Sequence, residues 1–185
     1  MTGRLAAAVL VLALAAGPAM AAAGKAGPKV APKAAPVAKP APKTTPVVMT
    51  APPTGSWRQL TRDHDTMGLV EAGSVKRKGD AAQLMLAVTL RTPIKAQDGQ
   101  AYVLVNTYEM DCKTAGARIT HSWGFDELGA PRYDGGPTAA AMQTPPAGSN
   151  LATLIDVACG KRPLAATPAW PDLLSARNAW MAAGQ

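Results

Sequence analysis

The chain has 185 residues, of which 48% are hydrophobic and only 4% aromatic, so its core must be largely aliphatic. Its 19 Lys and Arg against 12 Asp and Glu give a net charge of +7, but six of the basic residues precede residue 56 and all twelve acidic residues follow it. The remainder carries 13 basic and 12 acidic residues, a net charge of +1. A folded part so close to neutral argues against nucleic acid as a partner.

Residues 1–21 carry Arg4 near the start, continue as an apolar run and end in Ala19-Met20-Ala21. The run is too short to cross a bilayer, and the last three residues have the pattern of a cleavage site. We therefore expect a removable secretory signal and no transmembrane segment in the mature chain. Because no cysteine lies at the cleavage point, we expect an exported protein, periplasmic, surface-located or secreted, without a lipid anchor.

Residues 22–55 form a segment rich in Pro, Ala and Lys. Between residues 24 and 55 there are eight prolines, five lysines and no acidic residue. Proline removes a backbone donor and fixes φ, so the segment predicts a disordered spacer rich in polyproline II. A plain linker is one interpretation. The alternative is a basic tether that binds anionic peptidoglycan or anionic lipid.

A single domain is predicted over residues 56–160, beginning with two short strands at Trp57–Leu60 and Met67–Glu71. A turn at Lys78-Gly79-Asp80 then precedes Ala81–Leu90, in which apolar residues alternate with a period of two. That period is typical of a strand with one buried face. We therefore expect an antiparallel meander.

Cys112 falls at the end of the next predicted strand. Gln97–Gln100 contains Asp-Gly, a strong hairpin signal. Ala101–Asp111 follows, and counting by two from Tyr108 and Met110 places Cys112 on the same apolar face.

A further strand is predicted over residues 117–125, after a turn at Lys113–Gly116. Its alternation predicts one apolar face. The residues expected on that face are Ile119, His121, Trp123 and Phe125.

An amphipathic helix is predicted at Ser149–Cys159. Its apolar residues fall at i, i+3, i+4, i+7 and i+8, Ser149 or Asn150 is a suitable N-cap, and Gly160 is a suitable C-terminal glycine. Cys159 therefore lies on the buried stripe of a helix and Cys112 on the buried face of a strand. We expect a disulfide between them in an oxidising compartment. The alternative, a redox or metal-binding pair, lacks a C-x-x-C spacing.

Several segments resemble the surface-adhesin protein E family of exported bacterial domains. They are Trp57, GLVEAGSVKRKGD (68–80), AYVLVNTYEMDC (101–112), TPPAGS (144–149) and the helix that ends in Cys159. The resemblance covers about residues 56–160. It implies an α+β fold, with a single antiparallel sheet of about six strands and a C-terminal helix disulfide-linked to one face.

No catalytic residue, metal site or cofactor is predicted. His121 lies on an apolar face and is interpreted as a core histidine. The alternative of an enzyme or metal carrier depends on this residue and on His64, which lies between Asp63 and Asp65 in a predicted loop; adjacent side chains diverge and make a poor cation site. No nucleophile or phosphate-binding motif is present.

A candidate binding patch is formed by Lys76, Arg77 and Lys78, which are expected to project from a turn. The alternative is a solvated turn that keeps the protein soluble. Residues 161–185 are predicted as a C-terminal extension with a short amphipathic helix, with Pro171 as its first residue and its apolar side packed on the domain.

These observations predict an exported, non-enzymatic module for adhesion or protein–protein contact at the bacterial cell envelope. Its expected partners are extracellular-matrix or envelope proteins. The alternative function is a periplasmic envelope-associated structural protein whose basic tether binds anionic cell-wall polymers.

Overall fold

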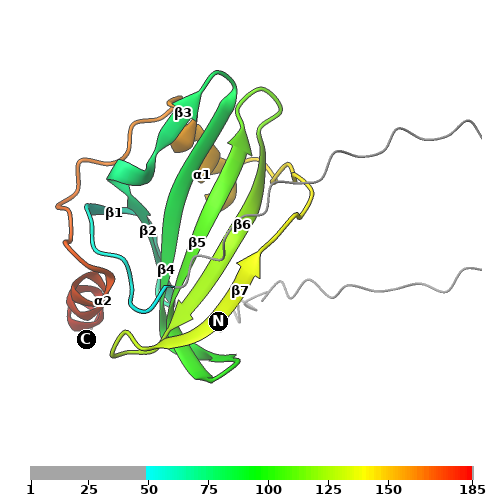
Figure 1. Ribbon diagram of the computed structural model, residues 1–185. Helices are drawn as coiled ribbons and strands as arrows, with labels where there is room; N and C mark the ends of the chain where they lie inside the picture. The colour runs from blue at the N-terminus through cyan, green and yellow to red at the C-terminus, as the bar shows by residue number, and fades with distance from the viewer. Residues whose placement is uncertain (1–48, 185) are drawn as a thin grey trace, which may run out of the picture. The chain divides into compact units, whose positions relative to one another are not determined.

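The computed structural model describes residues 49–184 (Figure 1). The predicted signal peptide and the part of the predicted linker up to residue 48 lie outside the described residues. Residues 49–184 form an α+β fold built on one antiparallel sheet, as predicted.

Seven strands make up this sheet. They are Trp57–Arg62 (β1), Thr66–Glu71 (β2), Lys76–Lys78 (β3), Ala81–Ala96 (β4), Gly99–Asp111 (β5), Gly116–Phe125 (β6) and Pro131–Pro137 (β7). Their order is β1-β2-β4-β5-β6-β7, and β3 pairs with the start of β4. A 3-10 turn, η1, spans Ala72–Ser74. Each strand pairs with its neighbour in sequence or nearly so, which is the meander that the short predicted turns require.

The central hairpin β4–β5 is longer than its pattern suggests. The predicted strand ended at Leu90, but β4 continues to Ala96 through an irregularity between Thr89 and Ile94. Ala96 then pairs with Gly99, so Gln97 and Asp98 form the two-residue turn of the hairpin. The Asp-Gly signal therefore located the hairpin correctly. The last residues of β4 were not predicted because Pro93 interrupts the period-two pattern and normally argues against a strand.

A β-bulge in β6 overturns one predicted face. Ile119 pairs with Tyr108, but His121 pairs with Thr107, so Thr120 is an extra residue. Because paired residues point to the same side, Ile119 and His121 lie on opposite faces of the sheet. The prediction that Ile119 shares a face with His121, Trp123 and Phe125 is therefore wrong, because strict counting by two does not allow for a bulge.

β7 was not predicted. Its sequence, PRYDGGP, contains two prolines and two glycines, which normally argue against a strand. It lies at the edge of the sheet and pairs irregularly with β6, where missing donors are tolerated.

Helix α1 spans Asn150–Ala158 and matches the predicted helix. Ser149 is the N-cap, and its hydroxyl oxygen accepts a hydrogen bond of 3.2 Å from the Ala152 N–H. After the C-cap at Cys159, Gly160 adopts a φ of 68°, which glycine allows without strain. A disulfide joins Cys159 to Cys112 with a Cα–Cα distance of 5.5 Å, which confirms the predicted pairing.

Helix α2 spans Leu173–Ala182, with Asp172 as its N-cap. Pro171 therefore precedes the cap, and the prediction that it opens the helix is wrong. The Asp172 carboxylate accepts hydrogen bonds from the Ser175 N–H (2.7 Å) and hydroxyl (2.8 Å), so this cap sets the helix start. Leu173, Ala176 and Trp180 are buried, and the extension thus packs on the domain as expected.

The two helices cover opposite faces of the sheet and opposite ends of its strands. The cluster under α1, on what we call the α1 face, comprises Val70, Ala82, Leu84, Met110, Ala117, Leu154, Ile155 and Ala158. The cluster under α2, on the α2 face, comprises Trp57, Met67, Leu69, Ala87, Val103, Val105, Trp123, Phe125, Leu173, Ala176 and Trp180. In Figure 1, α1 lies behind the upper part of β4 and β5, and α2 lies beside the lower part. Each helix therefore covers only part of its face.

Candidate functional site

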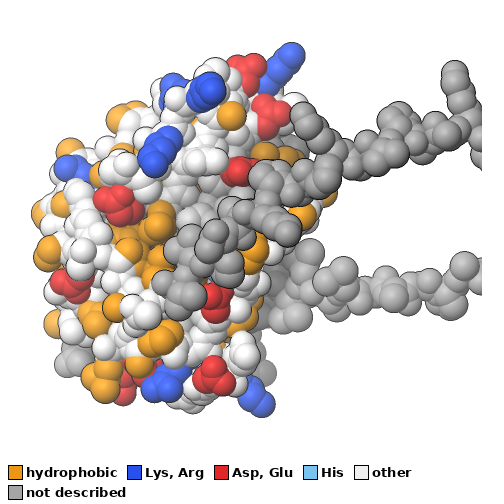
Figure 2. All heavy atoms as spheres, viewed as in Figure 1, with side chains coloured by type: hydrophobic (Ala, Val, Ile, Leu, Met, Phe, Trp, Pro, Cys, Tyr) orange, Lys and Arg blue, Asp and Glu red, His pale blue; other side chains and the backbone are white. Residues whose placement is uncertain are grey.

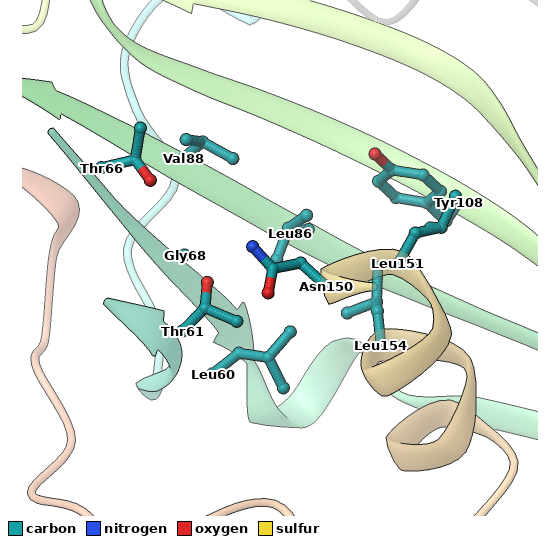
Figure 3. A pocket seen from close by; sticks show the side chains of 10 residues that line it. All are labelled: Leu60, Thr61, Thr66, Gly68, Leu86, Val88, Tyr108, Asn150, Leu151 and Leu154. Atoms are coloured by element: carbon teal, nitrogen blue, oxygen red, sulfur yellow. The ribbon is translucent and has the colours of Figure 1, made fainter. Parts of the chain in front are cut away.

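The open part of the α1 face contains an apolar pocket of about 220 Å³ beside the start of α1 (Figure 3). Leu86 and Val88 of β4 form part of its lining, together with Leu60 of β1. Leu151 and Leu154 of α1 contribute the helix side. The floor and walls therefore offer an apolar surface for a ligand group.

Polar groups from three elements surround this surface. Thr61 comes from β1, Thr66 from β2 and Asn150 from the first turn of α1. The Thr66 hydroxyl donates a hydrogen bond of 2.9 Å to the Asp63 carboxylate, whereas the side chains of Thr61 and Asn150 have no hydrogen-bond partner among residues 49–184. Figure 3 shows the Asn150 amide extended over Leu86. Both side chains therefore have unused hydrogen-bond donors and acceptors beside the pocket.

The hollow exists because of a glycine and a bulge. Gly68 pairs with Val88 across the sheet, and a Cβ on Gly68 would come within 2.5 Å of the Thr61 hydroxyl oxygen. The register of β1 shifts between Gln59 and Thr61, and both Leu60 and Thr61 line the pocket. A glycine inside a strand often marks a close approach, so Gly68 was the one sequence signal that could have indicated this site.

Tyr108 closes the pocket on the β5 side. Burial raises the pKa of its phenol above the ordinary value, so the group stays protonated and neutral throughout the physiological range. A neutral phenol adds ring surface and a hydroxyl to the site and no charge. The pocket is thus suited to binding an apolar group.

The predicted basic patch is divided between the two faces. Lys76, Arg77 and Lys78 form β3 instead of a turn, and Arg77 pairs with Ala82 of the α1 face. Lys76 and Lys78 alternate with it and belong to the α2 face. All three side chains are exposed and border one hollow beside Ala81–Gln83, so the predicted turn is wrong, while a binding role for the three residues stays a prediction.

Arg77 also has a structural contact. Its Nε and Nη2 each donate a hydrogen bond of 3.2 Å to the Ala158 carbonyl at the end of α1. This carbonyl belongs to the last turn of the helix, where a cation is favourable. Figure 2 shows Lys and Arg side chains gathered over the β3–β4 and β5–β6 turns, with acidic side chains among them.

His121 is buried, and its Nε2 lies 2.6 Å from the Asp134 carboxylate of β7. Its ring stacks on Trp123 with the centroids 3.9 Å apart. The Gly136 N–H and His121 lower the pKa of Asp134. This arrangement fastens β7 to β6, and the ring has little exposed surface for a substrate.

His64 is exposed, and its Nδ1 lies 2.8 Å from the Asp65 carboxylate. Asp63 instead accepts hydrogen bonds from the backbone of Asp65 and Thr66, as in a turn. Across residues 49–184, no three His, Cys, Asp or Glu side chains are grouped so as to hold a metal ion. Neither helix in that range has the length and apolar character needed to span a membrane.

Residues 49–184 thus contain a small α+β domain with a disulfide-linked helix and an apolar pocket beside that helix. Residues 57–160, more than half of the chain, match the family model described as Surface-adhesin protein E, and the chain belongs to this family. Membership indicates an adhesion-type surface protein. Helix α2 lies outside the matched segment. No curated protein matches the chain.

Proposed function

We propose that this protein is an exported, non-enzymatic module that makes adhesive or protein–protein contacts at the bacterial cell envelope. The observation that carries the proposal is the apolar pocket left open beside α1. Its volume of about 220 Å³ is below the roughly 300–1,000 Å³ of typical small-molecule sites. A pocket of this size suits one apolar side chain of a protein partner, the kind of anchor that dominates many interfaces.

The family match supports the same class of function. The partners that we propose are extracellular-matrix or envelope proteins. In this proposal the mature chain has lost residues 1–21, carries no lipid anchor and is periplasmic, at the cell surface or secreted. The pocket belongs to residues 56–160, which form the binding domain.

A second candidate function rests on the charge of the linker. Five lysines and no acidic residue between residues 24 and 55 would attract peptidoglycan or anionic lipid over a long range, and this attraction would weaken with salt. In that case the protein is a periplasmic, envelope-associated structural protein, and the folded domain is held near the wall by its tether.

The two functions are separated by binding measurements on a panel of matrix proteins and on purified peptidoglycan, at low and high salt. Asn150→Trp places an indole over the pocket from an exposed position. We expect the unaltered chain to bind a protein ligand saturably and Asn150→Trp to weaken this binding by at least about tenfold. A Lys76→Ala/Lys78→Ala variant tests the basic strand and leaves the Arg77 contact with α1 in place.

Retained binding by Asn150→Trp would contradict the pocket's role. Binding that goes only to peptidoglycan and disappears when residues 24–48 are deleted would establish the second function. Protease treatment of intact cells gives an independent answer, because a surface adhesin must be cleaved and a periplasmic protein must be protected.

A further inference from the structure

We propose that the groove between β1 and α1 binds an extended, acidic segment of a partner protein, which adds a strand to the free edge of β1. This inference rests on the proposed function and specifies the kind of partner. It follows from three features of the groove: a free backbone edge, two successive hollows and unpaired arginines.

The first feature is the outer edge of β1. Trp57 exchanges two backbone hydrogen bonds with Trp170, of 3.0 and 2.9 Å, in an antiparallel bridge. Beyond that bridge, no residue between 49 and 184 pairs with the outer side of Gln59–Arg62. The chain itself thus shows that this edge accepts an antiparallel extended segment, and it leaves the rest of the edge available.

The second feature is a pair of hollows between β1 and α1. The pocket described above is lined by Leu60 of β1 and Leu154 of α1. A wider hollow of about 530 Å³ is lined by Arg58 of β1 and Val157 of α1, and it is bordered by Ala72 and Val75 near η1 and by Gly160, Arg162, Pro163 and Leu164 of the segment that follows α1. Arg58 and Leu60 are two positions apart in β1, and alternate side chains of an extended segment recur at the same interval. Side chains i and i+2 of an added strand can therefore enter successive hollows.

The third feature is charge. Arg58 and Arg162 both line the wider hollow, and neither has a carboxylate within 4.0 Å among the described residues. Arg77 brings a third guanidinium to the end of α1, where it contacts Ala158. The wider hollow thus favours an acidic side chain, and the smaller pocket favours an apolar one.

The same charges disfavour two other occupants. A second copy of this chain pairing through β1 would bring WRQLTR against WRQLTR, with Arg58 and Arg62 of both copies at the interface. Residues 24–48 offer lysines, no carboxylate and several prolines that cannot donate to a strand ladder. An acidic segment from another protein satisfies both the edge and the arginines.

The test selects a displayed library of random octapeptides on the whole disulfide-bonded chain. The enriched peptides are then measured by fluorescence anisotropy. We expect them to combine Asp or Glu with aliphatic or aromatic residues at alternate positions. Arg58→Glu/Arg162→Glu should weaken their binding by at least about tenfold. Lys95→Glu is the matched control, because it reverses an exposed charge on β4 that pairs with Gln100 and lines neither hollow.

Hydrogen exchange then tests the strand addition. Bound peptide should protect the backbone amides in Gln59–Arg62, whereas a peptide bound elsewhere leaves them unchanged. The inference is overturned if no acidic peptide is enriched, if the double charge reversal binds as tightly as the unaltered chain, or if these amides stay unprotected.

The proposed function is judged separately, on the matrix-protein panel. If a matrix protein binds the double charge-reversal variant and the unaltered chain with equal affinity, the β1 groove is not its binding site. The proposed adhesive function would then still stand. Failure of every panel member to bind the unaltered chain would contradict the function, whatever the peptides do.

Discussion

The two helices are attached to the same sheet by different interactions. The end of α1 is fixed to the sheet by the Cys112–Cys159 disulfide and by the Arg77 contact with its last turn. Helix α2 has no covalent link and depends on burial, with Leu173 and Trp180 inserted into an aromatic cluster. The first helix can therefore keep its position next to an unfilled pocket, whereas the second must fill the space beneath it.

This difference separates the side of the molecule that contains the pocket from its main core. The cluster under α2 contains the largest buried side chains, Trp57 and Phe125 among them, yet α2 lies beyond the segment that matches the family. The matched segment thus supplies the pocket, and the extension after Gly160 supplies much of the packing on the opposite face.

The largest effect is expected from ending the chain at Gly160. Removing α2 uncovers Trp57 and Phe125 and deletes the buried Leu173 and Trp180, a loss on the order of 5–10 kcal/mol, which is comparable to the whole stability of a domain. We expect no cooperative thermal transition by circular dichroism. A chain that ends at Ala182 is the control and should unfold cooperatively. A sharp, unshifted transition in the shorter chain would show that α2 is dispensable.

The second effect is that of removing the disulfide. The bond closes a loop of 47 residues, so Cys112→Ala/Cys159→Ala should lower the free energy of unfolding by about 4 kcal/mol. Urea denaturation measures this change. Hydrogen exchange should show that α1 amides in the variant exchange by local opening. The α2 amides should still exchange only when the whole domain unfolds. Equal loss in both helices would mean that the two faces are one cooperative unit.

A smaller effect is expected at Arg177, a buried residue of α2. Its Nε donates a hydrogen bond of 3.2 Å to the Leu90 carbonyl, and its guanidinium lies 4.6 Å from the Tyr102 ring centroid. Arg177→Met should cost about 1–3 kcal/mol in urea denaturation. Arg91→Met, which removes the more exposed guanidinium 5.2 Å from the Trp180 ring centroid, is the control and should cost less. An equal cost for both would contradict the role assigned to Arg177.

The smallest effect concerns pH and the α2 cap. Hydrogen bonds from Ser175 lower the pKa of Asp172 below its ordinary value of 3.8. A lowered pKa in the folded state stabilises the protein above pH 3.8, and this contribution is lost as the pH falls through the folded-state value. Asp172→Asn keeps a capping oxygen and removes the titration. Its free energy of unfolding should differ from the unaltered chain by less than about 1 kcal/mol at pH 7, with the difference shrinking below pH 4.

Much of the fold could be predicted from local patterns. Ala81–Leu90 and Ala101–Asp111 alternate because one side of each strand is buried, and the helix that ends at Cys159 repeats its apolar residues with helical spacing. Both cysteines fall on these buried sides, so their pairing could be inferred without coordinates. The Asp-Gly turn located the central hairpin for the same reason: its signal lies within four consecutive residues.

The site could not be predicted in this way. The pocket is assembled from five elements, and its depth depends on Gly68 lying beside Thr61 in the next strand. The direction of Arg77 depends on which residue of β4 it pairs with, and the bulge at Thr120 changes the face of all the β6 residues before it. Each of these pairings joins residues on different strands, so local sequence patterns do not predict it.

The sequence by itself therefore determined the class of fold, the disulfide and the near-neutral charge of the domain, because alternation, capping and composition act over a few residues at a time. Only the tertiary structure decided that α1 leaves a pocket open and that α2 closes the opposite core. It also decided that Arg58 of β1 and Arg162, distant in sequence, line the same hollow. Such features depend on strand register and on the face of the sheet against which each helix packs. Both are set by the sum of many packing contacts between residues that are distant in sequence.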